Sequence, residues 1–124
     1  MTAVLTEVRT GRLATVRLGP NQDLVEGLQQ AAAELGFERA LIRSGLGSLI
    51  DCVIENGSGQ QRELRGPAVE ILTMLGEISP DAGETRVSCV VGETSGAVNA
   101  GRIVPGRNLV CVTAEVVLEE LLAA

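Results

Sequence analysis

Only one stretch of this 124-residue chain repeats its apolar residues at the spacing of a helix. These residues recur every three or four positions and are Leu24, Leu28, Ala31 and Leu35, joined by Val25 and Ala32. Such a repeat builds one apolar face on a helix. Asn21 stands where an N-cap belongs, and Gly36 stands where a left-handed residue ends many helices. The pattern predicts a single main helix from Gln22 to Leu35.

The rest of the chain has the residue pattern of strands separated by turns. Apolar and polar residues alternate over short runs, as they do in strands with one wet face, and glycine, proline and asparagine separate the runs. The runs cover residues 4–18, 40–42, 49–55, 68–78, 86–91, 97–104 and 108–117. We expect the tail, residues 118–124, to form a short helical turn. Together these features predict an α+β fold. A twisted, largely antiparallel sheet or partial barrel of six to eight strands would carry the helix on one face.

Length and composition set limits on this fold. Residues 1–124 have the length of a single domain, and 45% of them are hydrophobic, as in a packed globule. Aromatic residues make up only 1%, with Phe37 alone, so aliphatic side chains must fill a core to which aromatic ones usually contribute. Because so small a domain buries a modest share of its surface, we expect oligomerisation to add to its stability.

The sequence also indicates the compartment. No apolar run approaches the roughly 18–20 residues of a membrane span, and the start of the chain lacks the pattern of a secretion signal. We therefore expect a cytoplasmic protein without membrane contact. The spacing of Cys52, Cys89 and Cys111 fits neither a zinc nor a redox motif. We expect all three to be small core residues, and their odd number argues against structural disulfides.

The charge of the chain disfavours nucleic acid as a partner. The formal net charge is −6, and all ten basic residues are arginine. An acidic chain repels a polyanion unless its arginines gather on one face. Proteins that bind single strands also stack bases on aromatic side chains, which this chain nearly lacks.

Seven short motifs follow one another in an order that resembles the prokaryotic, stand-alone members of the PPC (plants and prokaryotes conserved) domain family. They are Pro-Asn-Gln-Asp-Leu-Val at 20–25, Ser-Gly-Leu-Gly-Ser at 44–48, Gly-Pro-Ala-Val-Glu-Ile-Leu at 66–72, Ile-Ser-Pro-Asp at 78–81, Val-Ser at 87–88, Gly-Ala-Val-Asn-Ala-Gly at 96–101 and Thr-Ala-Glu-Val-Val-Leu at 113–118. The resemblance covers roughly Val16 to Leu121. It implies a largely antiparallel sheet with one helix, assembled as a homotrimer.

The chain departs from this family at the positions that resemble a metal site. Many prokaryotic relatives carry a His-x-His before the Val-Ser strand and another histidine later, whereas this chain has no histidine. The matching places hold Glu84, Arg86 and Arg102. A guanidinium is permanently charged and has no lone pair for a metal, so the resemblance implies that the metal is lost here, and we expect no cofactor. The AT-hook of plant relatives, which enters the DNA minor groove, is also missing.

Arg86 and Arg102 form the main candidate ligand site. If the family geometry holds, both point into one cleft, where two forked guanidiniums suit a carboxylate or phosphate. The site would then hold a small anion near a subunit junction. Alternatively, Glu84 or another acid pairs with both arginines in a structural ion cluster.

Ser44 and Ser48 form a second candidate site within Ser-Gly-Leu-Gly-Ser, whose backbone amides could face a ligand. A phosphate-binding loop, however, opens onto a helix, whereas a strand is expected here, so a glycine bulge or close strand packing is favoured. We expect Glu70 and Glu115 to be exposed on strands, and Glu119 and Glu120 to be solvated at the chain end.

Three functions remain open. The first is a homotrimeric binding or regulatory module for a small anion or a protein partner. The second is a metal-independent enzyme in which Glu70 or Glu84 moves a proton on an anionic substrate held by the arginines. The third is DNA binding, a label that this family often carries and that the acidic charge disfavours.

Overall fold

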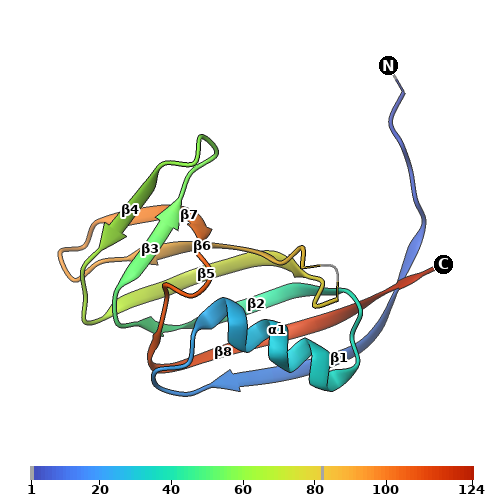
Figure 1. Cartoon of the computed structure of the whole chain (residues 1–124), viewed down its shortest axis with the longest axis horizontal. Coiled ribbons are helices and arrows are strands. Elements are labelled where there is room, and N and C mark those ends of the chain that lie inside the picture. The colour runs from blue at the N-terminus through green and yellow to red at the C-terminus, as the bar shows by residue number, and fades with distance from the viewer. Residues whose placement is uncertain (1, 82) are drawn as a thin grey trace.

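The structure is a computed structural model that describes residues 2–81 and 83–124. These residues form one helix and eight strands (Figure 1). In chain order the elements are β1 (Val8–Leu18), α1 (Leu24–Leu35), β2 (Ala40–Leu49), β3 (Cys52–Glu55), β4 (Gln61–Leu64), β5 (Val69–Ile78), β6 (Arg86–Gly92), β7 (Val98–Ile103) and β8 (Val110–Ala123).

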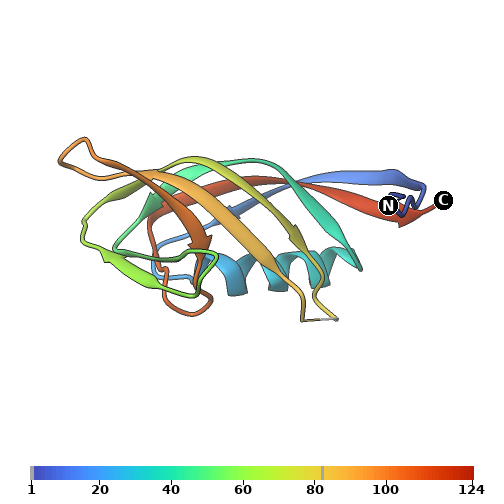
Figure 2. The same ribbon diagram turned by 90° about the horizontal axis from the view of Figure 1, so that it is seen from above.

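The strands form one antiparallel sheet in the order β1-β8-β2-β5-β6-β7-β3-β4. The sheet is twisted and curved, and α1 runs along one of its faces (Figure 2). The prediction of a largely antiparallel sheet with one helix is confirmed. The fold is richer in strand than the α+β class suggests, because a 12-residue helix accompanies eight strands. β4 lies outside every run predicted from the sequence.

Helix α1 begins two residues later than predicted. Asp23, not Asn21, is the N-cap: its Oδ2 accepts a hydrogen bond from the amide of Glu26 at 3.0 Å. Asn21 instead adopts a positive φ of 69° in the turn before the helix. Gly36 ends the helix in the left-handed conformation, with a φ of 75°, as predicted.

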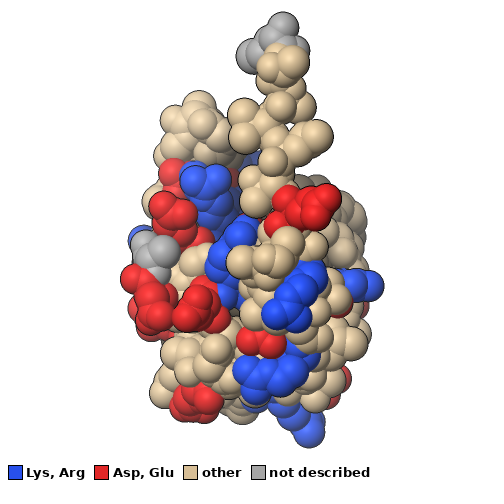
Figure 3. Space-filling view, turned by 90° about the vertical axis from the view of Figure 1, so that its right-hand side faces the viewer, with Lys and Arg blue, Asp and Glu red and all other residues tan. Residues whose placement is uncertain are grey.

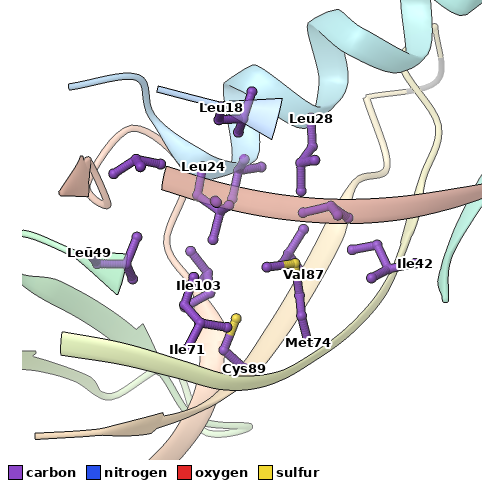
Figure 4. Close-up of a cluster of buried hydrophobic side chains, with 14 of the residues drawn as sticks. Leu18, Leu24, Leu28, Ile42, Leu49, Ile71, Met74, Val87, Cys89 and Ile103 are labelled. Carbon is purple, nitrogen blue, oxygen red and sulfur yellow. The ribbon is translucent and has the colours of Figure 1, made fainter. Parts of the chain in front are cut away.

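The core lies between α1 and the sheet (Figure 4). Leu24, Leu28 and Ala32 of the helix are fully buried and face a layer of aliphatic side chains that the sheet contributes, among them Ile71, Met74, Val87, Ile103 and Leu118. Phe37 is buried as well. Alternate residues of each strand point away from this core, and among the described residues no helix covers that opposite, open face of the sheet.

The tail of the chain differs from its prediction. It continues β8 to Ala123 and pairs with β1, so the expected helical turn is wrong. Glu119 and Glu120 are buried and not solvated. Nη1 of Arg43 forms an ion pair with Oε1 of Glu119 at 2.8 Å. The backbone amide and the guanidinium of Arg12 both donate hydrogen bonds to the carboxylate of Glu120. Paired charges can be buried in this way because each retains an opposite charge and hydrogen bonds.

The cysteines follow the prediction in part. Cys52 and Cys89 are buried, and burial raises the pKa of each thiol to about 12. Such thiols stay protonated and unreactive at neutral pH. Cys111 is only half-buried. None of the helices in the described residues has the length and apolar character needed to cross a membrane.

Candidate functional site

Arg86 and Arg102 line the same pocket, which has a volume of about 520 Å³. Arg86 opens β6 and Arg102 lies near the end of β7, the neighbouring strand. Both residues are exposed. Their neighbours in sequence, Val87 and Ile103, are buried in the core, so strand alternation directs the two arginines to the open face of the sheet.

Strand register fixes which side chains surround the arginines. Ser88 of β6 pairs with Arg102 on one side and with Leu75 of β5 on the other, and Arg102 pairs with Glu55 of β3. Glu55, Arg102 and Ser88 form a polar row across the pocket that ends at Leu75 on β5, and Arg86 lies diagonal to this row. The next row holds Thr73, Val90 and Ala100, which are also cross-strand partners. All of these side chains line the pocket, together with Asn56, Gly57, Cys89 and Gly101.

The two arginines differ in how they are paired. Nη2 of Arg102 lies 3.9 Å from Oε1 of Glu55, a long contact between two partly exposed side chains. Within the part of the chain that the structure describes, none of the ion pairs or side-chain hydrogen bonds involves Arg86 or the Ser88 hydroxyl. The strand partner of Arg86 is Glu77, and Glu77 binds Arg39 instead, with an Arg39 Nε to Glu77 Oε1 distance of 2.7 Å.

Glu84 does not join the arginine pocket. It lines a separate hollow of about 510 Å³, together with Glu38, Arg39, Glu77, Ser79 and Asp81. The acid beside the arginines is therefore Glu55, which the sequence did not single out. Glu55 ends a strand just before an Asn-Gly turn, but only the pairing of β3 with β7 brings it to Arg102.

Ser44 and Ser48 also lie apart from the arginines. Ser44 lines a hollow of about 420 Å³ between β1, β8 and β2, where Arg17 and Glu115 form an exposed ion pair at 3.7 Å. The Ser48 hydroxyl accepts a hydrogen bond from the amide of Val112 at 3.3 Å. The segment is part of β2, with register shifts against β8. A side chain at Gly47 would collide with the Thr113 carbonyl, so close strand packing explains the glycine.

The open face also carries exposed apolar side chains. Leu46, Leu72, Leu75 and Val98 lie on β2, β5 and β7 and are between 47% and 66% exposed. We call these four residues the apolar patch. Leu75 belongs both to this patch and to the arginine pocket. Large apolar side chains that gather on one face are typical of an interaction surface.

The charged surface is mixed in sign. In the view of Figure 3, arginines and acidic residues are interspersed over the end of the molecule where the N-terminal segment projects. Five of the ion pairs between described residues are Arg12–Glu120, Arg17–Glu115, Arg39–Glu77, Arg43–Glu119 and Arg65–Glu63. Arginines paired in this way contribute little positive field for a polyanion.

The comparison with known families identifies the class of the chain. Residues 5–122 match the model of the Plants and Prokaryotes Conserved (PCC) domain, the family called PPC above. The chain belongs to this family. Its fold is shared by solved structures of similar shape but low sequence identity.

Three solved structures illustrate the shared fold. A plant- and prokaryote-conserved protein from Pyrococcus horikoshii is 20% identical, with a TM-score of 0.79 over 98% of this chain and 87% of that one. A metal-containing protein from Archaeoglobus fulgidus is 22% identical, with the same TM-score and coverage. A protein from Bacteroides thetaiotaomicron, described as a candidate DNA-binding protein, is 17% identical, with a TM-score of 0.74 over 91% and 83% of the two chains.

A longer relative contains a similar stretch. The bifunctional protein GlmU of Synechococcus sp. strain JA-3-3Ab is 29% identical over 111 residues, which cover 90% of this chain. The match spans 17% of the length of that protein.

The residues of this chain do not fit the metal that the family implies. Two of the three matching positions are the arginines of the pocket, whose guanidiniums offer no lone pair, and Glu84 lies in another hollow. Across residues 2–81 and 83–124, no three histidine, cysteine, aspartate or glutamate side chains gather as a metal-binding group. The chemistry of this pocket suits an anion.

Proposed function

We propose that the chain is a cytoplasmic, homotrimeric binding or regulatory module that holds a small anion in the arginine pocket. The observation that carries this proposal is that two arginines from adjacent strands line one pocket beside a single carboxylate. No described residue forms an ion pair or side-chain hydrogen bond with Arg86, so its guanidinium can form a forked contact with a carboxylate or phosphate. The Ser88 hydroxyl between the two arginines adds a hydrogen-bond donor.

Thermal stability in different anions tests this binding. We expect 50 mM acetate or phosphate to raise the unfolding temperature above that in chloride at equal ionic strength, because a ligand of the folded state stabilises it. Unfolding is followed by circular dichroism, since the chain has no Trp or Tyr. Arg86→Gln should abolish the increase. Arg65→Gln removes a charge outside the pocket, where the side chain is 82% exposed, and should preserve it. An increase of the same size in both variants contradicts the site.

The apolar patch supports the proposed self-association. Its side chains, Leu46, Leu72, Leu75 and Val98, are exposed to water. If a second copy covers them, the assembly gains about 25 cal/mol of stability for each Å² of apolar surface that is buried. Because Leu75 belongs to both the patch and the pocket, such contacts would place the anion near a subunit junction.

Light scattering after size-exclusion chromatography tests this assembly. The wild type should elute with the mass of a trimer, and Leu72→Glu should shift it to monomer, because a glutamate buried at an interface has no partner. Leu109→Glu alters a leucine that is 40% exposed in the loop before β8 and should leave the mass unchanged. A wild type that is monomeric at 50 μM contradicts the proposal.

A metal-independent enzyme acting on a small anion is the alternative. It needs a carboxylate that can exchange a proton with the bound anion. Glu55 is the carboxylate in the pocket, but it faces Arg102, whereas Glu70 is exposed on β5 and does not line the pocket. The geometry therefore supports binding better than catalysis. The GlmU match, a small part of a longer protein, is also compatible with a module that accompanies other units.

DNA binding is the third function. It is worth testing because the similar Bacteroides structure is described as a candidate DNA-binding protein. The net charge of −6 and the paired arginines oppose it. We expect no retention of a 30-base-pair duplex in a filter-binding titration up to 20 μM protein at low salt. Retention that weakens steeply with added salt would show a phosphate-backbone interface instead.

A further inference from the structure

We propose that the ligand of the arginine pocket is a monocarboxylate with an apolar body, such as a medium-chain fatty acid, in preference to a phosphate dianion. This inference rests on the proposed anion site and names the chemical class of its ligand. Its carboxylate would bind beside Arg86 and Ser88, and its apolar body would lie along Val90 and Ala100.

The first argument comes from the arrangement of the two rows. Ser88 and Arg102 are partners in the polar row, and Thr73, Val90 and Ala100 stand side by side in the next row. Leu75 ends the polar row on β5, two residues from Thr73. A ligand that spans the rows therefore meets charge and the Ser88 hydroxyl at one end, and the side chains of Val90 and Ala100 beside Thr73 at the other. Pockets that combine apolar walls with a few convergent polar groups are typical sites for small organic molecules.

The second argument comes from charge. Two guanidiniums and the carboxylate of Glu55 leave the pocket with one net positive charge. One negative charge on a ligand balances this. A second negative charge would lie in the repulsive field of Glu55, which already contacts Arg102. The pocket therefore favours a monoanion over a dianion.

The third argument comes from size. The pocket holds about 520 Å³, which is within the range of about 300–1,000 Å³ for small-molecule sites. Acetate or inorganic phosphate would fill only the charged end and leave Val90 and Ala100 without a ligand contact. Each methylene that leaves water strengthens binding about four-fold. A tail that covers these two side chains therefore adds affinity that a bare ion lacks.

Isothermal titration calorimetry at pH 8 tests the class with four probes: octanoate, acetate, octyl phosphate and inorganic phosphate. At this pH the phosphates are dianions, because their second pKa lies near 6 to 7. We expect octanoate to bind at least thirty-fold more tightly than acetate and at least ten-fold more tightly than octyl phosphate. All titrations stay below the micelle concentration of the probe, and circular dichroism verifies the fold of each variant.

Two matched pairs of variants locate the binding. Arg86→Gln should weaken octanoate binding at least ten-fold, while Arg65→Gln leaves it unchanged. Leu75→Asn should weaken octanoate binding several-fold without affecting acetate binding, measured on a sample whose mass by light scattering equals that of the wild type, because Leu75 also belongs to the apolar patch. Leu13→Asn is its control, because Leu13 is 64% exposed against 66% for Leu75 but does not line the pocket. Arg102→Gln provides a second charge variant if Arg86→Gln does not fold.

The outcomes separate this inference from the proposal on which it rests. If phosphate and octyl phosphate bind as tightly as octanoate and depend on Arg86, the anion site stands and the monocarboxylate class is refuted. If octanoate binds equally to the wild type and to Arg86→Gln, the tail adsorbs to apolar surface and the inference fails. If none of the four probes binds at 5 mM, both the inference and the anion site fail.

Discussion

Replacing Asn108 by alanine should destabilise the fold strongly, because its side chain connects β3 to the loop between β7 and β8 within the core. Asn108 is fully buried. Its Oδ1 accepts a hydrogen bond from the amide of Val53 at 2.9 Å, and its Nδ2 donates to the carbonyls of Val53 and Val104 at 2.9 and 3.0 Å. Its backbone amide donates to Oδ1 of Asp23, the cap of helix α1. The side chain thus links β3 to the β7–β8 loop, and the backbone amide of the same residue links this loop to the start of the helix.

The magnitude follows from the groups that lose their partners. In Asn108→Ala the Val53 amide is left buried without an acceptor, which costs about 1–3 kcal/mol. The Val53 carbonyl keeps a bond from the amide of Val104 at 3.1 Å, so its loss is smaller. Two further hydrogen bonds disappear, at about 1 kcal/mol each. We expect a loss of roughly 3–5 kcal/mol in the free energy of unfolding, as the sum of these terms.

Urea unfolding followed by circular dichroism measures this loss, with wild type and variant at equal protein concentration. With a slope of about 2 kcal/mol per molar urea, the midpoint should fall by roughly 1.5–2.5 M. Asn99→Ala is the control, because the Asn99 side chain bonds Arg62 and Glu93 at the partly exposed edge of β7. It should cost less than about 1 kcal/mol. A loss for Asn108→Ala as small as that of the control would refute the reasoning.

Two further predictions concern the tail and a tight strand crossing. Hydrogen bonds from Arg12 lower the pKa of the Glu120 carboxyl, so its stabilisation is complete above its unfolded pKa and is lost as pH falls through its folded pKa. Glu120→Gln should therefore flatten the decline of the urea midpoint below about pH 4.5, where an ordinary Glu is more than half protonated, and an unchanged decline contradicts this. Gly47→Ala should cost more than about 2 kcal/mol or prevent folding, because Gly47 has a φ of 143° and a side chain would meet the Thr113 carbonyl. Gly57→Ala, which has open space around it, should fold normally by circular dichroism.

Local patterns predicted the helix and most strands because those elements depend on near neighbours in sequence. The 3.6-residue repeat places Leu24 and Leu28 in the core, and Gly36 ends the helix in a conformation that favours glycine. The N-cap was predicted at Asn21 and lies at Asp23. The sequence could not choose between them, because asparagine and aspartate are both good N-cap residues. The selection of Asp23 depends on a second bond, from the distant amide of Asn108.

The features that the sequence did not predict depend on contacts between distant segments. In the sequence, Glu119 and Glu120 have the pattern of a solvated chain end. In the structure they are paired with Arg43 and Arg12, which lie on other strands. Glu55 likewise enters the pocket only because β3 pairs with β7. The two arginines were identified from a family resemblance, and their common pocket follows from the register of β6 against β7.

Native mass spectrometry of gently purified protein tests the central claim most directly, because it reports assembly and bound ligand together. The account predicts a trimer that carries a small organic anion, and the loss of that adduct in Arg86→Gln but not in Arg65→Gln. A monomer, or an adduct that persists in Arg86→Gln, would contradict it.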